Sequence, residues 1–311
     1  MRKIILDVDT GIDDAIAIIL AVASKEIELL GITVTSGNIH VDQGIINTKR
    51  ILKVLGQAHV KVYRGSAVPV KRPLVDASHI HGKDGLSGQL LDISVTPESD
   101  GCAFEFLEEA ITTYGDDLTI IMTGPETNLA KLLRLKPYLK GKIKHVIAMG
   151  GAINLKGNAT IVGEFNIVTD PEAAYDAFHA GIDDFTLLSL DVTRQGLISK
   201  SDLKRIENPK VKKILAGLTE NYMDRYFHGN GKYGCLMHDP LTILYFLNPS
   251  LVETEKAYVT VERTGEYTYG MTICDSNKRL GQEKNIYISK TLNVENFKND
   301  FFDLMNQLII E

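Results

Sequence analysis

The chain has 311 residues, 44% of them hydrophobic, and a mean hydropathy of -0.02, values typical of a globular protein with a substantial core. Its formal net charge of -6 argues against the basic surface that binding to a phosphate backbone requires, so we expect no nucleic-acid partner. The longest apolar run, residues 15–23, is shorter than the roughly 20 residues of a membrane span, so we expect no membrane anchor.

The start of the chain and its cysteines indicate the compartment. The first apolar stretch ends at Asp7, before the core of a signal peptide could form. Cys102, Cys235 and Cys274 are widely spaced and include no Cys-x-x-Cys pair, which fits reduced thiols. These features predict a cytoplasmic protein that binds no zinc through cysteine.

Short β-branched segments alternate with segments of helical periodicity along the first part of the chain. The segments typical of strands are residues 3–9, 29–35, 60–64, 118–123, 143–149 and 185–190. The segments typical of helices are residues 13–24, 43–55, 104–114, 128–135 and 171–180. The alternation predicts an α/β fold, with an open, doubly wound, mostly parallel (mixed) sheet of Rossmann-like type flanked by helices.

The pattern changes after residue 191. Longer helices are expected at residues 201–227 and 240–246, followed by a strand-like region at 257–288. Because no low-complexity linker separates the two parts, we expect one domain over residues 1–311. Residues 65–101, rich in Gly, Pro, Asp and His, form a long loop that is a candidate lid, although the sequence does not indicate whether it closes.

Four aspartates lie where the first expected strand ends. Asp7 and Asp9 share a face of the strand, Gly11 turns the chain, and Asp13 and Asp14 begin the next helix, whose dipole favours carboxylates. This is the edge at which open α/β sheets bind ligands. A lone aspartate here would be interpreted as a turn or cap residue, but four favour a ligand site.

These carboxylates predict a bound cation. Two like charges about 4 Å apart cost roughly 4 kcal/mol at an effective dielectric of about 20, so the cluster is hard to keep ionised without a counter-ion. Oxygen ligands select Ca²⁺ or Mg²⁺, and a carboxylate-rich group with backbone carbonyls nearby suits the larger shell of Ca²⁺.

The letters Gly-Ile-Asp-Asp occur twice, at residues 11–14 and 181–184. The second copy follows an expected helix and precedes an expected strand, which puts it at the opposite, amino-terminal edge of the sheet. We therefore interpret the second copy as a polar turn and only the first as part of a site.

Other polar residues are expected at the same edge as the four aspartates. They follow the second, fourth and fifth strands at residues 35–38, 123–125 and 149–151. The irregular segment 158–166 offers two amides and a carboxylate suited to the hydroxyls of a sugar. Each segment alone is more typical of a turn, but their common position favours a site.

The ordered set of motifs resembles the inosine-uridine-preferring nucleoside hydrolase family over nearly the whole chain. The matching segments are residues 7–15, 36–38, 123–128, 149–151, 157–158, 164–166, 170–174 and 238–240. The resemblance implies the nucleoside hydrolase fold and Ca²⁺-dependent hydrolysis of the N-glycosidic bond of ribonucleosides to base and ribose, in nucleoside salvage. It also implies a homodimer or a homotetramer.

The resemblance also implies a set of site residues. One Ca²⁺ per subunit would be bound by Asp9, Asp14, Asp239 and the backbone carbonyl of Thr123, with Asp7 supporting the cluster. Asp9 would be the general base for a metal-bound water, and the transition state would resemble an oxocarbenium ion. His238 would protonate the departing base or hydrogen-bond to it.

The expected substrate contacts form two groups. Those around the ribose are Asp13, Asn38, Met149, Asn158, Glu164, Phe165 and Asn166. Those near the base are His81, Tyr222 and Tyr226. The tyrosine pair and the absence of tryptophan favour the broad inosine-uridine type, but the sequence does not fix the preferred base.

The chain departs from the family pattern at two positions, Thr10, where most members have proline, and Glu126, which is unusual in its motif. Two other functions were considered. A haloacid-dehalogenase-like phosphatase also begins with a strand and Asp-x-Asp, but it requires Thr or Val where this chain has Gly11. A non-catalytic nucleoside-binding protein would not need both Asp9 and His238.

Overall fold

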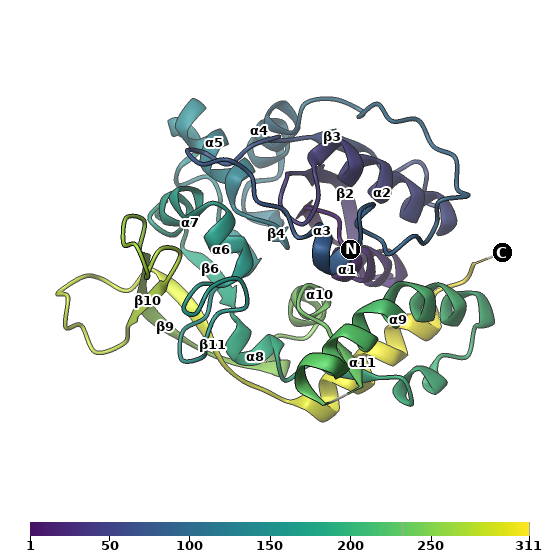
Figure 1. Cartoon of the computed structure of the whole chain (residues 1–311). Coiled ribbons are helices and arrows are strands. Elements are labelled where there is room, and N and C mark those ends of the chain that lie inside the picture. The colour runs from purple at the N-terminus through teal and green to yellow at the C-terminus, as the bar shows by residue number, and fades with distance from the viewer. Residues whose placement is uncertain (232, 311) are drawn as a thin grey trace.

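The computed structural model describes residues 1–231 and 233–310, and its centre is a nine-stranded sheet (Figure 1). The strand order is β10-β9-β11-β6-β5-β4-β1-β2-β3. Adjacent strands from β11 to β3 are parallel, whereas β9 is antiparallel to both β11 and β10. The expected mostly parallel, mixed sheet is therefore confirmed.

Six strands come from the first part of the chain and match the expected segments closely. They are β1 (Arg2–Val8), β2 (Ile27–Val34), β3 (Val62–Arg64), β4 (Leu118–Met122), β5 (His145–Met149) and β6 (Asp184–Leu188). The remaining three are β9 (Val252–Val261), β10 (Thr272–Asp275) and β11 (Ile286–Leu292). Both halves of the chain thus contribute strands to the same sheet.

Helices cover both faces of this sheet because its strands are apolar on both sides. Along β1, Ile4, Leu6 and Val8 belong to one buried cluster, whereas Ile5 belongs to another, as the two-residue period of a strand requires. The helices of the first face are α1 (Ile12–Ala23), α2 (Val41–Val54), α9 (Pro209–Asn230), α10 (Pro240–Leu247) and α11 (Val294–Gln307). Those of the second face include α4 (Ala103–Tyr114), α5 (Thr127–Leu135) and α7 (Pro171–Phe178).

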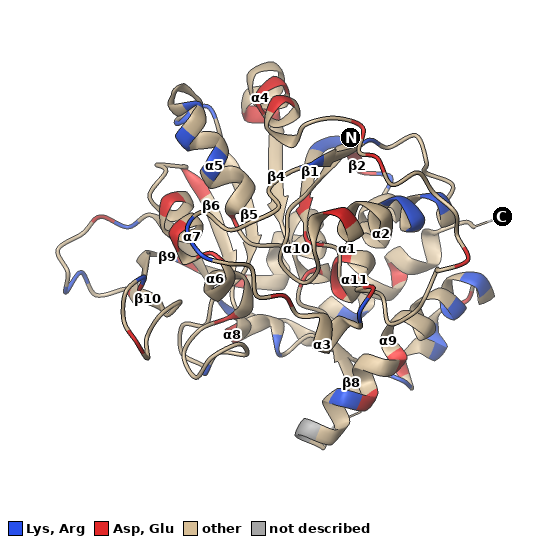
Figure 2. Cartoon of the chain, turned by 45° about the horizontal axis from the view of Figure 1, so that its top comes forward, with Lys and Arg blue, Asp and Glu red and all other residues tan. Residues whose placement is uncertain are grey.

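The shorter elements lie in the connections. They are α3 (Ser78–His81), α6 (Phe165–Thr169), α8 (Leu190–Thr193), a hairpin of β7 (Leu197–Ser199) and β8 (Gly234–Leu236), and 3-10 turns at Gly115–Asp117, Pro137–Leu139, Asp202–Arg205 and Pro249–Leu251. The loop 65–101 carries α3 and is otherwise irregular. Lys and Arg residues lie along outer helices such as α2 and α9 (Figure 2).

The expected helix at residues 201–227 was wrong at its start. The helix begins at Pro209, because the side chain of Asn208 accepts hydrogen bonds from the backbone N–H groups of Lys210 and Val211. Before this cap, residues 202–205 form only a 3-10 turn, and Asp202 accepts hydrogen bonds from Ser199.

The prediction of a single strand-like region at residues 257–288 was also too coarse. It is divided between three strands, the first of which begins at Val252 and the last of which ends at Leu292. The C-terminal helix α11, whose buried residues include Phe297, Phe301 and Phe302, was not predicted. No helix in the described part of the chain is long and apolar enough to cross a membrane.

Candidate active site

Three buried carboxylates meet where β1 ends and α10 begins. Asp13, Asp14 and Asp239 each place one carboxylate oxygen within 4.8 Å of the others. Burial first, and then the charge of Asp14, raises the pKa of Asp13 to about 7, and burial raises the pKa of Asp239 well above its usual range. The Oδ1 atom of Asp13 is buried without a hydrogen-bond partner. A buried group of acidic oxygens with a free acceptor fits a hard divalent cation such as Ca²⁺.

Asp14 is held in place by the turn that begins α1. Its Oδ2 accepts hydrogen bonds from the backbone N–H of Gly11 (2.8 Å) and from the Asn38 side chain (3.2 Å). Its Oδ1 accepts a hydrogen bond from the hydroxyl of Thr123 (2.7 Å). These donors come from three different strand ends, so the first βα turn fixes the orientation of Asp14.

Asp9 lies beside this group, against the segment after β2. Its Oδ2 accepts a hydrogen bond from the backbone N–H of Asn38 (2.6 Å), and its Oδ1 accepts one from the Asn38 side chain (3.1 Å). A Cβ atom on Gly37 would lie 2.1 Å from Oδ2, so only glycine permits this approach. Burial, followed by the charge of Asp14, raises the pKa of Asp9 well above its usual range.

Asp7 lies beneath the cluster and is tied to the neighbouring strands. Its Oδ2 accepts hydrogen bonds from Thr33 (2.6 Å) and from the side chain of Asn128 (2.8 Å). Burial raises its pKa to about 7. The structure therefore brings together all four aspartates of the first turn, with Asp13 in the three-carboxylate group and Asp9 bonded to Asn38.

Four of the expected ribose contacts, Met149, Glu164, Phe165 and Asn166, come together around α6. Glu164 caps this helix, because its carboxylate accepts hydrogen bonds from the backbone N–H groups of Gly151, Asn166 and Ile167. The side-chain nitrogen of Asn166 donates to the backbone carbonyls of Thr123 (2.7 Å) and Met149 (3.0 Å).

Asn158 is joined to this group more loosely than Asn166. It is exposed, and its side-chain oxygen accepts a hydrogen bond from the backbone N–H of Phe165 (2.9 Å). Of the polar residues expected at the strand ends, Asn38 after β2 thus bonds to Asp9 and Asp14, whereas Thr123 and Met149 after β4 and β5 accept hydrogen bonds from Asn166.

His81 of the loop 65–101 lies against the start of α1. Its Nδ1 accepts a hydrogen bond from the backbone N–H of Ile12 (3.1 Å), and burial lowers its pKa to about 3. Arg225 of α9 donates to the backbone carbonyls of His79 and Ile80. In this structure the loop is therefore packed between α1 and α9, over the edge that carries the aspartates.

His238 and the tyrosine pair complete the set of expected residues. His238 lies directly before Asp239, is buried, and has its pKa lowered to about 4 by burial. The rings of Tyr222 and Tyr226 are stacked on α9 with their centroids 6.5 Å apart. Burial first, and then the charges of Cys235 and Asp13, raises the pKa of Tyr222 well above its usual range.

Two further buried residues were not predicted as part of the site. The hydroxyl of Thr193 lies 2.7 Å from Nδ1 of His238. Glu126 is fully buried, neither of its carboxylate oxygens has a hydrogen-bond partner in the described chain, and burial raises its pKa to about 8. Thr193 follows β6, so the rule that pointed to the ends of the other strands would also have indicated this residue.

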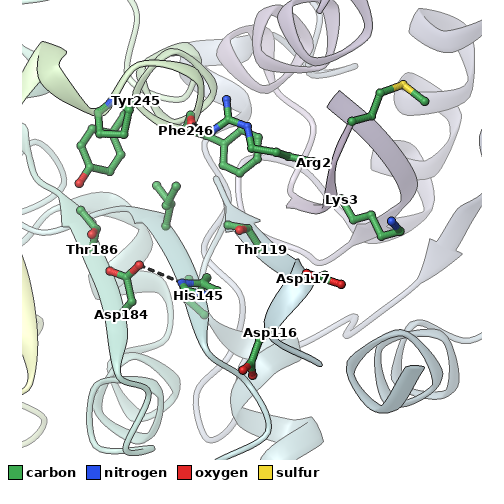
Figure 3. A pocket seen from close by; sticks show the side chains of 14 residues that line it. Arg2, Lys3, Asp116, Asp117, Thr119, His145, Asp184, Thr186, Tyr245 and Phe246 are labelled. Atoms are coloured by element: carbon green, nitrogen blue, oxygen red, sulfur yellow. Dashed lines mark hydrogen bonds and ion pairs between the residues drawn. The ribbon is translucent and has the colours of Figure 1, made fainter. Parts of the chain in front are cut away.

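A hollow of about 510 Å³ lies at the opposite edge of the sheet, at the amino ends of β1, β4, β5 and β6 (Figure 3). It is lined by polar and aromatic side chains, among them Arg2, Thr119, Thr186 and Tyr245. Nδ1 of His145 and Oδ2 of Asp184 are 2.9 Å apart at its floor. Its position separates it from the carboxylate cluster.

The α/β sheet, with buried carboxylates, amides and a histidine at the carboxyl ends of its strands, matches what the sequence resemblance implied for the nucleoside hydrolase class. The model of the inosine-uridine preferring nucleoside hydrolase family matches residues 4–299. The chain belongs to this family.

Individual relatives agree with the family match. A pyrimidine-specific ribonucleoside hydrolase of Salmonella schwarzengrund (strain CVM19633) is 38% identical over 309 residues, which cover 97% of this chain and 96% of the relative. The solved structure of a purine-preferring ribonucleoside hydrolase from Gardnerella vaginalis has a TM-score of 0.91 at 35% identity and covers 99% of each chain. A plant nucleoside hydrolase has a TM-score of 0.91 at 26% identity, covering 98% of this chain and 99% of its own.

These relatives establish the class of reaction. The chain is a nucleoside hydrolase, so the match decides against both the phosphatase and the non-catalytic binding protein. The expected family resemblance and fold are confirmed.

Proposed function

We propose that this enzyme is a Ca²⁺-dependent hydrolase of inosine-type and uridine-type ribonucleosides, which it converts to free base and ribose for nucleoside salvage. The observation that carries the proposal is the buried group of Asp13, Asp14 and Asp239, with its unpartnered Asp13 oxygen, beside Asp9. Such a group is hard to maintain unless a cation offsets its charges.

Asp14 and Asp239 would hold the ion, together with Asp9 and the backbone carbonyl of Thr123, as the family resemblance implies. Asp13 lies within the same group and can bind a ribose hydroxyl beside the ion. A bound Ca²⁺ would orient the attacking water and the ribose hydroxyls and would lower the pKa of that water.

Asp9 is the general base of the proposed reaction. Its carboxylate takes the proton of the attacking water, and its two hydrogen bonds to Asn38 fix its orientation. As the bond between the ribose and the base breaks, positive charge develops on the ribose, and the surrounding carboxylates stabilise it. His238 stabilises the departing base.

The proposed substrate contacts are those that the family resemblance implies. The residues that would surround the ribose are Asn38, Met149, Asn158, Glu164, Phe165 and Asn166. The bonds of Asn38 to Asp9 and of Asn166 to Met149 and Glu164 support this arrangement, and Asn158 is joined to it through Phe165. His81, Tyr222 and Tyr226 would contact the base. The relatives differ, one being named pyrimidine-specific and another purine-preferring, so the proposal of a broad preference rests on the tyrosine pair.

The compartment and the oligomeric state of the enzyme are also part of the proposal. The absence of disulfides among Cys102, Cys235 and Cys274 supports a cytoplasmic enzyme. The family resemblance supports a homodimer or homotetramer.

The proposal is tested by incubating the purified enzyme separately with inosine, uridine, cytidine and adenosine and measuring the release of reducing sugar. The assay is repeated after exhaustive chelation and after Ca²⁺ or Mg²⁺ is added back. We expect ribose release from both inosine and uridine, loss of release on chelation, and recovery with Ca²⁺. Hydrolysis of only one base class would contradict the broad preference, and full activity after chelation would contradict the role of the ion.

A further inference from the structure

Two buried side chains form a contact behind the site that the proposed reaction does not use. The hydroxyl oxygen of Thr193, at the end of α8, lies 2.7 Å from Nδ1 of His238. The side chain of Thr193 is fully buried, and His238 is only 9% exposed. At this depth a hydrogen bond is shielded from competition with water, so its direction matters for both groups.

The backbone holds these two residues beside each other. Strands β7 and β8 pair in antiparallel fashion, with Leu197 opposite Leu236. The ladder is extended toward the site by a hydrogen bond from the N–H of Met237 to the carbonyl of Gly196 (3.0 Å). Thr193 and His238 flank this extension, so their contact is set by the small β7–β8 sheet.

The other end of α8 is also anchored. The carboxylate of Asp191 accepts hydrogen bonds from the backbone N–H groups of Ile153 (2.9 Å) and Asn154 (2.8 Å) and from the hydroxyl of Ser189 (3.0 Å). The helix is thereby tied to the loop after β5. Thr193 is presented to His238 from a short helix that is fixed at both ends.

The direction of the hydrogen bond follows from the needs of the hydroxyl. A buried hydroxyl is strongly favoured to donate its hydrogen, and Nδ1 of His238 is the one hydrogen-bond partner of the Thr193 hydroxyl in the described residues. Nδ1 therefore carries no hydrogen. A neutral imidazole in this state has its hydrogen on Nε2. No residue in the described part of the chain bonds to Nε2, so this N–H is available to a ligand.

We propose that Thr193 is a positioning residue that holds His238 as the neutral tautomer with its hydrogen on Nε2, so that His238 donates a hydrogen bond to the departing base. The inference rests on the proposed role of His238 in the hydrolysis. The base leaves with the electron pair of the glycosidic bond, and the Nε2–H group stabilises the negative charge that develops on it. His238 transfers no proton. Asp9 releases to solvent the proton that it took from the attacking water. The departing base takes up a proton from solvent.

The opposite arrangements are disfavoured by the same hydrogen bond. With hydrogen on Nδ1, in the other tautomer or in the charged imidazolium, the imidazole would donate to Thr193, and the buried O–H would lose its acceptor. The other tautomer would also present Nε2 to the base as an acceptor, which repels the developing charge. Thr193 thus favours the tautomer of His238 that can donate a hydrogen bond to the base, although Thr193 itself does not contact the substrate.

Thr193→Val and Thr193→Ser test the proposal. Valine has the shape of threonine without the hydroxyl, whereas serine keeps the hydroxyl. Each variant is assayed with uridine, whose base is a poor leaving group, and with p-nitrophenyl riboside, whose leaving group needs no stabilisation. Thr112→Val, on the exposed face of α4, is the matched control for the substitution itself.

For Thr193→Val we expect kcat with uridine to fall by about 10- to 100-fold, part of the loss expected when a preorganised donor is removed. With p-nitrophenyl riboside kcat should change by less than about 3-fold, and Thr193→Ser should keep most of both activities. Equal losses with both substrates would show a merely structural role and overturn the proposal. Unchanged activity with uridine would overturn it as well.

Nitrogen NMR of histidine-labelled enzyme gives an independent readout. We expect His238 in the wild type to show a protonated Nε2 and an unprotonated Nδ1, and this preference to weaken in Thr193→Val. A protonated Nδ1 in the wild type would overturn the proposal even if ribose release continues. If His238→Ala leaves hydrolysis of uridine unchanged, the proposed role of His238 itself fails, which separates the two failures.

Discussion

The sequence Gly-Ile-Asp-Asp occurs at both edges of the sheet, and the aspartates of the two copies differ in burial and in the direction of their pKa shifts. At residues 11–14 both aspartates are buried, and burial raises the pKa of Asp13 to about 7. At residues 181–184 both aspartates are exposed, and the Lys144 side chain lowers the pKa of Asp183.

The difference arises from position in the fold. The first copy begins a helix at the carboxyl end of β1, where other strand ends supply amide and hydroxyl donors to Asp14. Among the described residues, no cationic side chain forms an ion pair with Asp13 or Asp14. The second copy precedes β6 at the amino edge, where Lys144 and His145 pair with Asp183 and Asp184. The same four residues therefore lie among converging buried carboxylates in the first copy only, and it is there that the proposed Ca²⁺ would balance their charge.

The largest expected effect comes from matched substitutions in the two copies. Asp14→Asn removes a charge that would hold the ion and stabilise the oxocarbenium-like ribose, so kcat/KM should fall by about 10³-fold or more. Asp184→Asn removes the equivalent charge at the other edge and should change kcat/KM by less than about 2-fold, because exposed ion pairs contribute little. Ribose release from uridine by both variants measures the comparison. Similar losses in the two would contradict it.

A smaller effect concerns stability as a function of pH. Burial raises the pKa of Glu126 from 4.5 to about 8, so the folded protein binds the proton more tightly than the unfolded chain does. The stability that this proton provides is fully present below pH 4.5 and is lost as the pH rises through about 8. Glu126→Gln should therefore have a higher Tm than the wild type at pH 8.5, and the difference should disappear near pH 5.

Asp183→Asn is the control for this measurement, because the pKa of Asp183 is shifted in the opposite direction. Its lowered pKa stabilises the folded protein above the usual pKa of aspartate, and this effect is lost as the pH falls. Since the pair with Lys144 is solvent-exposed, we expect almost no change in Tm at pH 8.5. A Tm for Glu126→Gln equal to or below that of the wild type at pH 8.5 would show that Glu126 has a stabilising partner as a carboxylate.

Much of the fold could be predicted because its parallel strands are short, apolar and separated by periodic helices. The six strands from β1 to β6 and the longer helices between them follow directly from this pattern, whereas the short helices α3 and α6 were not predicted. The predicted start of α9 was wrong because the hydrophobic periodicity before Asn208 resembles that of the helix. Only the Asn208 cap and Pro209 mark the residue at which the helix begins. The three-residue strands β7 and β8 are too short to give a periodic signal.

The aspartates of the site could be located from the sequence, but not their individual contacts. The four aspartates of the first turn were placed at the correct edge from strand and helix periodicity alone. Which of them meets Asp239 depends on how α10 packs against α1, which no local pattern encodes. The bond between Thr193 and His238 likewise joins residues 45 positions apart, through a hairpin that was not predicted.

The most direct test of the central claim is a titration of Ca²⁺ into the chelated enzyme, with ion binding and uridine hydrolysis followed in parallel. If the buried carboxylates hold a catalytic ion, hydrolysis should rise in proportion to bound Ca²⁺ and saturate at one ion per chain. Asp239→Asn should abolish both the binding and the hydrolysis. Full hydrolysis before Ca²⁺ is added, or binding that leaves the rate of hydrolysis unchanged, would contradict the account.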